Sequence, residues 1–219
     1  MPNRCRLAAI LTAALALSSP VLAFDSPLSE EAVREAYFLG QRHDDSLARV
    51  LAKYSLVLPP PDRGPHIASV TFLTPFAVVA QSSSQHINYS AQQAALDHRG
   101  QKESVKIIVE IRFTASYPAV VVRPTGASSS SPQGFTPRPY NFWKDFDVQT
   151  LVNDTAVAPF SSYGEPNIVC DLQGGCDFIG ATITLEYAAD LFSANSASVV
   201  IAPPEGESIS VDFDLTELR

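Results

Sequence analysis

Positive charge is scarce in this chain, and no stretch of it gathers lysine or arginine. The 219 residues include 15 Lys and Arg against 23 Asp and Glu. Proteins that bind nucleic acid or an anionic membrane surface present a basic face to the phosphates. We therefore expect neither nucleic acid nor an anionic membrane surface among the partners.

Sequence motifs of the common catalytic and cofactor-binding families are also missing. The chain has no Gly-x-Ser-x-Gly elbow, no Gly-x-Gly-x-x-Gly fingerprint and no phosphate-binding loop. Its four histidines, His43, His66, His86 and His98, do not occur in a His-Glu-x-x-His or His-x-His spacing. We expect no metal site and no cofactor, and we favour a non-catalytic protein over an enzyme.

No apolar run is long enough to cross a membrane. The longest N-terminal run, Leu7 to Leu17, has eleven residues, whereas a membrane-spanning helix needs roughly 20. Arg4 and Arg6 precede this run and a small-residue site ending in Ala23 follows it, which is the pattern of a secretory signal peptide. Residues 1–23 are therefore predicted to be removed.

Removal of the signal peptide would leave an acidic mature chain that begins at Phe24. It would have 13 basic and 23 acidic residues, a net charge of −10. Such charge keeps an exported protein soluble. We expect a periplasmic or extracellular protein with no stable membrane insertion after cleavage.

Cysteine is rare, and only two cysteines remain in the predicted mature chain. Cys170 and Cys176 flank a short segment that contains Gly174 and Gly175, which can form a tight turn. In an oxidising compartment this spacing predicts a disulfide. Zinc would need further Cys or His ligands close by in the sequence, and none is present.

Residues 24–58 carry the helical pattern of the chain. Ser29 can cap a helix, and apolar residues recur at helical spacing over 33–40 and again over 47–54. One helix from Ser29 to Tyr54 or two helices broken near 40–45 would fit. We favour the break, because Gly40 suits a helix end and the following aspartates suit a helix start.

Residues 59–219 are dominated by strand patterns, which predicts a mainly β fold. A single short helix is expected after Ser90, which with Gln93 forms a capping box. The expected strands are 67–74, 76–83, 105–113, 119–122, 142–152, 167–170, 176–187, 198–202 and 208–215. The last two read as a hairpin. We expect a β-sandwich with an N-terminal helical segment, and a β-barrel as the alternative.

Residues 124–139 are rich in serine, proline and glycine, and we expect a mobile loop there. A linker between two small domains would have a similar composition. We favour one domain, because each half alone would leave many strand edges unpaired.

Aromatic residues cluster just after this loop. Tyr140 and Trp143, if exposed, would form a platform that binds a glycan or peptide, and they are the candidate ligand-binding residues. If Trp143 is instead buried, it belongs to the core together with Phe142 and Phe146. We favour the core interpretation, in which Phe142 and Phe146 are buried and Trp143 covers an edge.

Carboxylates recur in two similar segments and support an alternative function. Asp145 and Asp147 share one strand face, as do Asp212 and Asp214. Such pairs could act as acid and base in a hydrolase, and His98 beside Asp97 could join them. A solvated strand face produces the same pattern, and a helix-terminal histidine explains His98.

The sequence thus predicts an exported, non-catalytic domain that binds a protein or a glycan in the envelope or outside the cell. An exported hydrolase with strand-borne carboxylates is one alternative. A structural subunit of an envelope assembly is the other.

Overall fold

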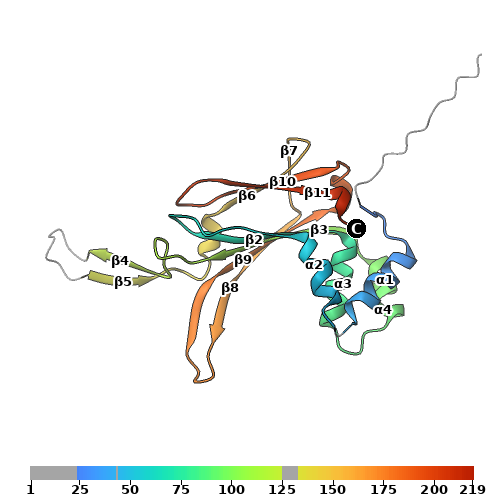
Figure 1. The fold of residues 1–219 in the computed structure, drawn as a ribbon, viewed down its shortest axis with the longest axis horizontal. Helices are drawn as coiled ribbons and strands as arrows, with labels where there is room; N and C mark the ends of the chain where they lie inside the picture. The colour runs from blue at the N-terminus through green and yellow to red at the C-terminus, as the bar shows by residue number, and fades with distance from the viewer. Residues whose placement is uncertain (1–23, 43, 125–132) are drawn as a thin grey trace, which may run out of the picture.

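A computed structural model describes residues 24–42, 44–124 and 133–219. The predicted signal peptide and part of the predicted loop lie outside the described residues. Two layers of antiparallel sheet stack on each other, and helices cover the outer face of the larger sheet near one end (Figure 1). The prediction of a mainly β, sandwich-like fold is confirmed.

The larger sheet has five strands in the order β1-β2-β3-β9-β8. Their bounds are β1 Ser55–Val57, β2 His66–Leu73, β3 Ser104–Arg112, β8 Ser161–Cys170 and β9 Cys176–Ala188. The smaller sheet has the order β11-β10-β6-β7. Its strands are β6 Asp147–Val152, β7 Thr155–Val157, β10 Ser196–Ala202 and β11 Ile209–Asp214. None of the described sheets closes on itself, so the alternative of a β-barrel is wrong. The predicted hairpin of β10 and β11 is confirmed.

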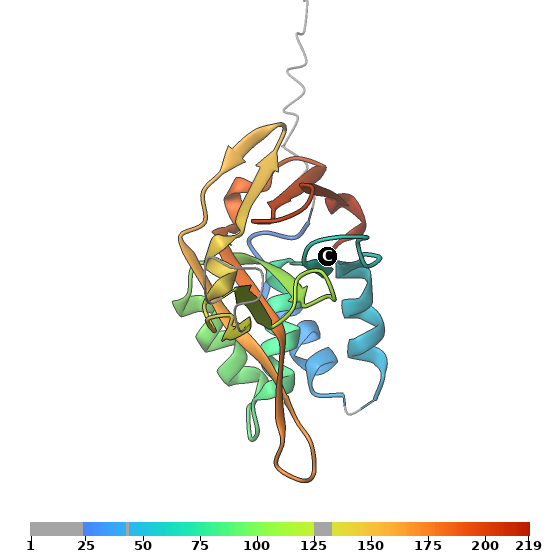
Figure 2. The ribbon, with the colours of Figure 1, turned by 90° about the vertical axis from the view of Figure 1, so that its left-hand side faces the viewer.

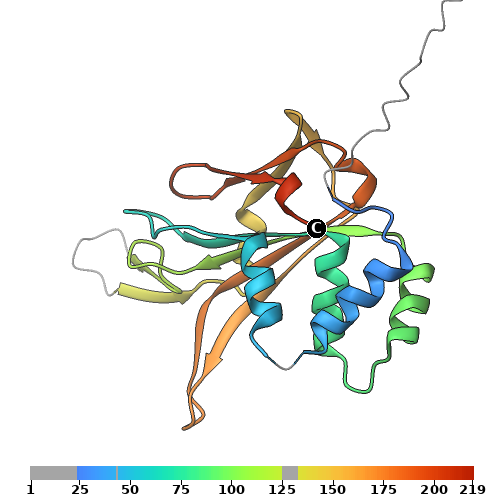
Figure 3. The ribbon, with the colours of Figure 1, turned by 45° about the vertical axis from the view of Figure 1, so that its right-hand side comes forward.

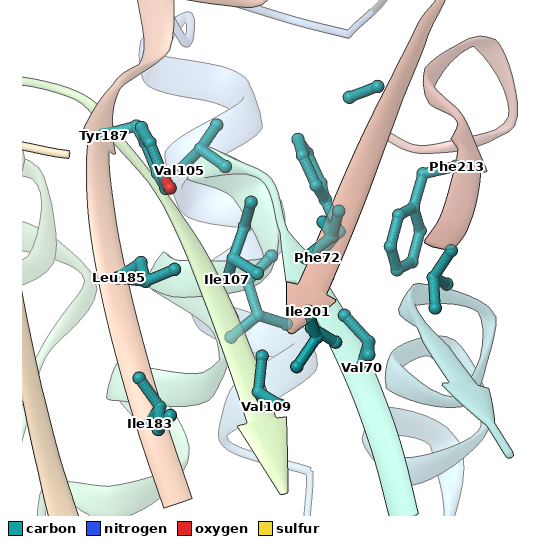
Figure 4. Close-up of a cluster of buried hydrophobic side chains, with 14 of the residues drawn as sticks. Val70, Phe72, Val105, Ile107, Val109, Ile183, Leu185, Tyr187, Ile201 and Phe213 are labelled. Atoms are coloured by element: carbon teal, nitrogen blue, oxygen red, sulfur yellow. The ribbon is translucent and has the colours of Figure 1, made fainter. Parts of the chain in front are cut away.

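The main core lies between these two sheets. Alternate residues of β3 face it, and Val105, Ile107 and Val109 are completely buried. Figure 4 shows them packed with side chains from β2, β9, β10 and β11. The period-two pattern of β3 therefore places one face in the core, as its sequence predicts.

The helices are α1 Glu30–Gly40, α2 Ser46–Leu51, α3 Pro75–Gln85 and α4 Ala91–Gly100. The predicted break between the first two is confirmed, and Ser29 Oγ accepts a hydrogen bond from Ala32 N–H at 3.1 Å. Ser90 caps α4 in the same way, accepting from Gln93 N–H at 3.1 Å. The three longer helices share a second, smaller apolar core. In Figure 2 the helices lie on the opposite side of the molecule from β10 and β11.

Helix α3 corrects the prediction of a strand over 76–83. Val78, Val79 and the following serines favour strand over helix by propensity, which explains the error. The N-terminal signals were nevertheless present in the sequence: Thr74 Oγ1 caps the helix by accepting from Ala77 N–H, and Pro75 occupies the first turn. Because α3 follows β2 directly, it folds back onto the outer face of the sheet.

The predicted loop over 124–139 also needs correction. Residues Gln133–Pro137 form strand β5, which pairs with β4 (Val120–Pro124). Arg138 anchors this hairpin, because its Nε donates to the Pro118 carbonyl at 2.8 Å and its guanidinium stacks on buried Tyr117. The remaining loop residues, 125–132, lie outside the described residues.

Smaller corrections concern strand boundaries. The predicted helical segment 24–58 ends in β1, which joins the sheet edge beside β2. The predicted strand 142–152 starts as a 3₁₀ helix, η2 Phe142–Asp145, and only then becomes β6. Strand β8 is longer than the predicted 167–170, and the short β7 was missed because three residues give too little pattern. Among the described residues, no helix is both long and apolar enough to cross a membrane.

Candidate functional site

One hairpin extends well beyond the sheet that carries it. Pairing between β3 and β9 ends at Arg112 and Gly180, whereas β8 and β9 continue to pair as far as Cys170 and Cys176. Residues 168–178 thus form a two-stranded ribbon, which we call the arm. In Figures 1 and 3 the arm projects away from the body of the molecule.

The tip of the arm is cross-linked and tightly turned. The predicted disulfide between Cys170 and Cys176 is confirmed. Asp171 Oδ1 accepts backbone N–H bonds from Gln173 at 2.9 Å and from Gly175 at 2.8 Å. Gly174 has a φ of 87°, which only glycine adopts without strain. The sequence therefore holds this turn in one conformation through three separate devices.

The arm exposes apolar side chains on this cross-linked turn and beside it. Leu172 at the tip is fully exposed, Val169 is 56% exposed and Ile168 is also exposed. Isolated exposed apolar residues are ordinary, but several gathered on one projecting element are typical of interaction surfaces. Asp171 and Asp177 lie beside them, Glu165 precedes them, and residues 161–180 contain no Lys or Arg. The arm is thus both apolar and acidic.

Tyr140, one of the two predicted ligand-binding residues, lies at the root of the arm. Its ring is 63% exposed and packs edge-on against Phe178 with centroids 5.0 Å apart. Phe178 in turn contacts Phe113 and Phe142, with centroids 4.9 and 5.8 Å away. This aromatic cluster joins the arm to the body of the protein.

Trp143, the other predicted residue, lies on η2 and packs against β8 away from the arm. Its ring is half-buried against the main core and lies over Gly164 of β8, where a Cβ atom would come within 2.4 Å of the indole. No ring contact joins Trp143 to Tyr140 in the described part of the chain. The structure therefore does not unite the two residues in one aromatic platform.

The strand-borne carboxylates do not converge. Asp147 pairs in register with Ala202 at one end of β10, and Asp214 pairs with Ser196 at the other end. Each accepts a local hydrogen bond, Asp147 from Gln149 and Asp214 from Thr216. Hydrogen bonds from the Thr216 hydroxyl and backbone N–H lower the pKa of the Asp214 carboxyl, which is typical of a capping residue.

His98 lies in a hollowed region at the C-terminal end of α4. Its Nε2 is 3.0 Å from Glu103 Oε1. The same carboxylate accepts from Leu28 N–H at 2.6 Å and from Ser26 Oγ at 2.7 Å. Glu103 thereby ties the N-terminal segment to the end of α4, so the contact of His98 is structural. The neighbouring Asp97 accepts from Tyr89 Oη at 2.9 Å.

Two further hollows adjoin this one, and Lys102 lines all three. The residues come from the N-terminal segment, α3, α4, the start of β3, the segment before β8, and β9 with the residues that follow it. Because they are distant in sequence and match no motif, sequence reasoning missed this region. Within the described residues, no three His, Cys, Asp or Glu side chains gather as a metal-binding group.

The raised pKa values of three tyrosines predict how the free energy of unfolding changes at high pH. Burial raises the pKa of Tyr89 to about 12, with the bond to Asp97 adding to the effect, and burial raises the pKa of Tyr117 and Tyr187. An unfolded tyrosine loses its proton near pH 10. Above that pH the folded state holds more protons than the unfolded state, so the free energy of unfolding should fall as pH rises.

Urea unfolding at steps from pH 8 to pH 11.5 checks this expectation. Tyr89→Phe removes one of the three groups and should make the decline shallower. A free energy of unfolding that stays constant over pH 10–11.5 would contradict it.

The disulfide gives a second prediction. Cys170→Ser with Cys176→Ser should lower stability by about 2 kcal/mol, because the bridge closes only a short loop. The β-sandwich should remain folded, since the two cysteines and the turn between them lie outside both apolar cores. Chemical unfolding and mass spectrometry before and after reduction provide the measurements. Two freely alkylated thiols in the unreduced native protein would refute the bridge.

Comparison with known proteins adds no assignment, because the sequence matches no protein-family model and no curated protein. The structure itself therefore has to support the functional conclusion.

Proposed function

We propose that the protein is exported and binds a partner protein through the β8–β9 arm. The proposal rests on the cross-linked tip of the arm, where Leu172 is fully exposed. Ordering a flexible loop on binding costs free energy for each immobilised residue. The disulfide and the hydrogen bonds of Asp171 already order the tip when the protein folds. Binding by this segment therefore loses less conformational entropy.

The chemistry of the arm defines the kind of partner. Leu172 and Val169 require an apolar pocket that removes them from water. Asp171 and Asp177 flank them and favour basic side chains at the rim of that pocket. A second arm would bring like charges together, so the partner is a different protein surface with an apolar, basic-rimmed pocket.

Export supports this assignment and can be tested separately. The disulfide agrees with an oxidising compartment, and the sequence of residues 1–23 predicts a cleaved leader. N-terminal sequencing of the protein from the extracytoplasmic fraction should give Phe24. A mature soluble protein that starts at Met1 would contradict the prediction.

Photocrosslinking in the exporting host tests the binding proposal. Leu172 is replaced in one strain by a photoreactive benzoylphenylalanine, and Ile87 in another. Ile87 is the matched control, because it is 92% exposed but lies after α3, outside the arm. The arm position should give a discrete crosslinked protein that the control position does not give.

Two results would overturn the proposal. One is the same crosslinking pattern from both positions. The other is a crosslink only to a second copy of this chain, identified by mass spectrometry, which would make the arm a self-association element.

A further inference from the structure

A polar hollow lies on the other side of the larger sheet from the sandwich core, between α3 and the start of β3. Its volume is about 450 Å³, within the size range of small-ligand sites. Lys106 and Glu186, paired at 2.9 Å, form part of it on adjacent strands. We call it the α3 hollow.

Half of the residues that line it carry a side-chain amide or hydroxyl. Gln81 comes from α3, Gln101 from the end of α4 and Ser104 from β3. In the described part of the chain, neither amide makes a side-chain hydrogen bond. Such groups both donate and accept, which suits a ligand rich in hydroxyls.

One wall is aromatic and open to solvent. Phe160 is 59% exposed, and its backbone N–H donates to the Glu186 carbonyl at 2.8 Å, which fixes it at the edge of the hollow. An exposed ring beside unpaired polar groups can cover the apolar face of a sugar while the polar groups bind its hydroxyls.

Charge narrows the class of ligand further. Among the charged side chains that line the hollow, Lys106 is paired with Glu186, whereas Lys102 enters none of the ion pairs among the described residues. The uncompensated charge in the hollow is therefore a single positive one, in a chain that is acidic overall. An ammonium of this kind favours a carboxylate.

We infer that the α3 hollow binds a carboxylated sugar, with Lys102 on the carboxylate, Phe160 against the ring and the glutamine amides on the hydroxyls. The hollow lies near the start of β8 and the arm at its end, and the inference does not depend on the arm. Either can fail without the other.

Calorimetric titration with trigalacturonate tests it, with the methyl ester of the same trisaccharide as the uncharged control ligand. Trigalacturonate should bind about tenfold more tightly than the ester, as expected for hydrogen bonds to a charged group. Lys102→Gln should abolish this preference, and Phe160→Ala should weaken the binding of both ligands.

Lys53→Gln is the control variant, because Lys53 is exposed and lies on η1, away from the hollow. It should bind both ligands like the wild type. The inference would be overturned if neither trisaccharide binds, if both bind with equal affinity, or if Lys102→Gln still prefers trigalacturonate. Melting temperatures of all variants separate a lost site from a lost fold.

Discussion

Replacing Gly180 with alanine should destabilise the protein by about 3 kcal/mol, the upper part of the usual range for overpacking. A Cβ atom at this position would lie 1.9 Å from the Ile111 carbonyl oxygen and 3.0 Å from the Arg112 Cα. Both atoms belong to the backbone of β3, which cannot move without breaking its pairing with β9. Gly180 is also the last β9 residue in register with β3, so the arm leaves the sheet there.

Gly100→Ala is the matched control for this substitution. It also replaces glycine with alanine, so both changes reduce the freedom of the unfolded chain equally. Its Cβ would meet no atom within 4 Å, and stability should stay within about 0.5 kcal/mol of wild type or rise. Urea unfolding measures both variants. A loss below about 1 kcal/mol for Gly180→Ala would contradict the close strand approach.

Trp143→Ala should cost about 2–4 kcal/mol of stability, somewhat below the loss for fully buried aromatic residues because the ring is half-buried. The indole covers Gly164 and packs on the main core, so its removal exposes both. Tyr140→Ala is the informative comparison, since that ring is mostly exposed. It should cost less than about 1 kcal/mol.

Intrinsic fluorescence complements the unfolding measurements, because Trp143 is the only tryptophan. The native emission should be partly protected from a soluble quencher. A Trp143→Ala variant with wild-type stability that no longer binds the crosslinked partner would instead establish Trp143 as a binding residue.

Sequence patterns succeeded where one periodicity dominates. Strict alternation in β3 predicted its buried face, and the cap at Ser29 predicted the start of α1. The prediction for α3 was wrong because two adjacent valines and three serines lower its helix propensity, while its helical state depends on packing against α1. Gly40 shows this dependence, since a Cβ there would meet the Ala80 carbonyl at 2.1 Å.

The candidate sites were only partly predictable. The disulfide could be predicted from two cysteines on either side of a glycine turn. Leu172, an apolar residue in that predicted turn, also indicated an exposed apolar tip, but the sequence analysis did not use it. The length of the arm was not predictable, because it depends on where β3 stops pairing with β9. The α3 hollow was not predictable either, since its residues meet only through the tertiary fold.

The affinity of the crosslinked partner for arm variants tests the central claim most directly. The purified partner is titrated calorimetrically with wild-type protein, with Val169→Ser plus Leu172→Ser, and with Ile87→Ser as the control. The double arm variant should bind at least about thirtyfold more weakly, as expected when central apolar anchors are removed, while the control binds like wild type. Equal affinity for wild type and the arm variant, with both folded, would show that the arm is not the binding element.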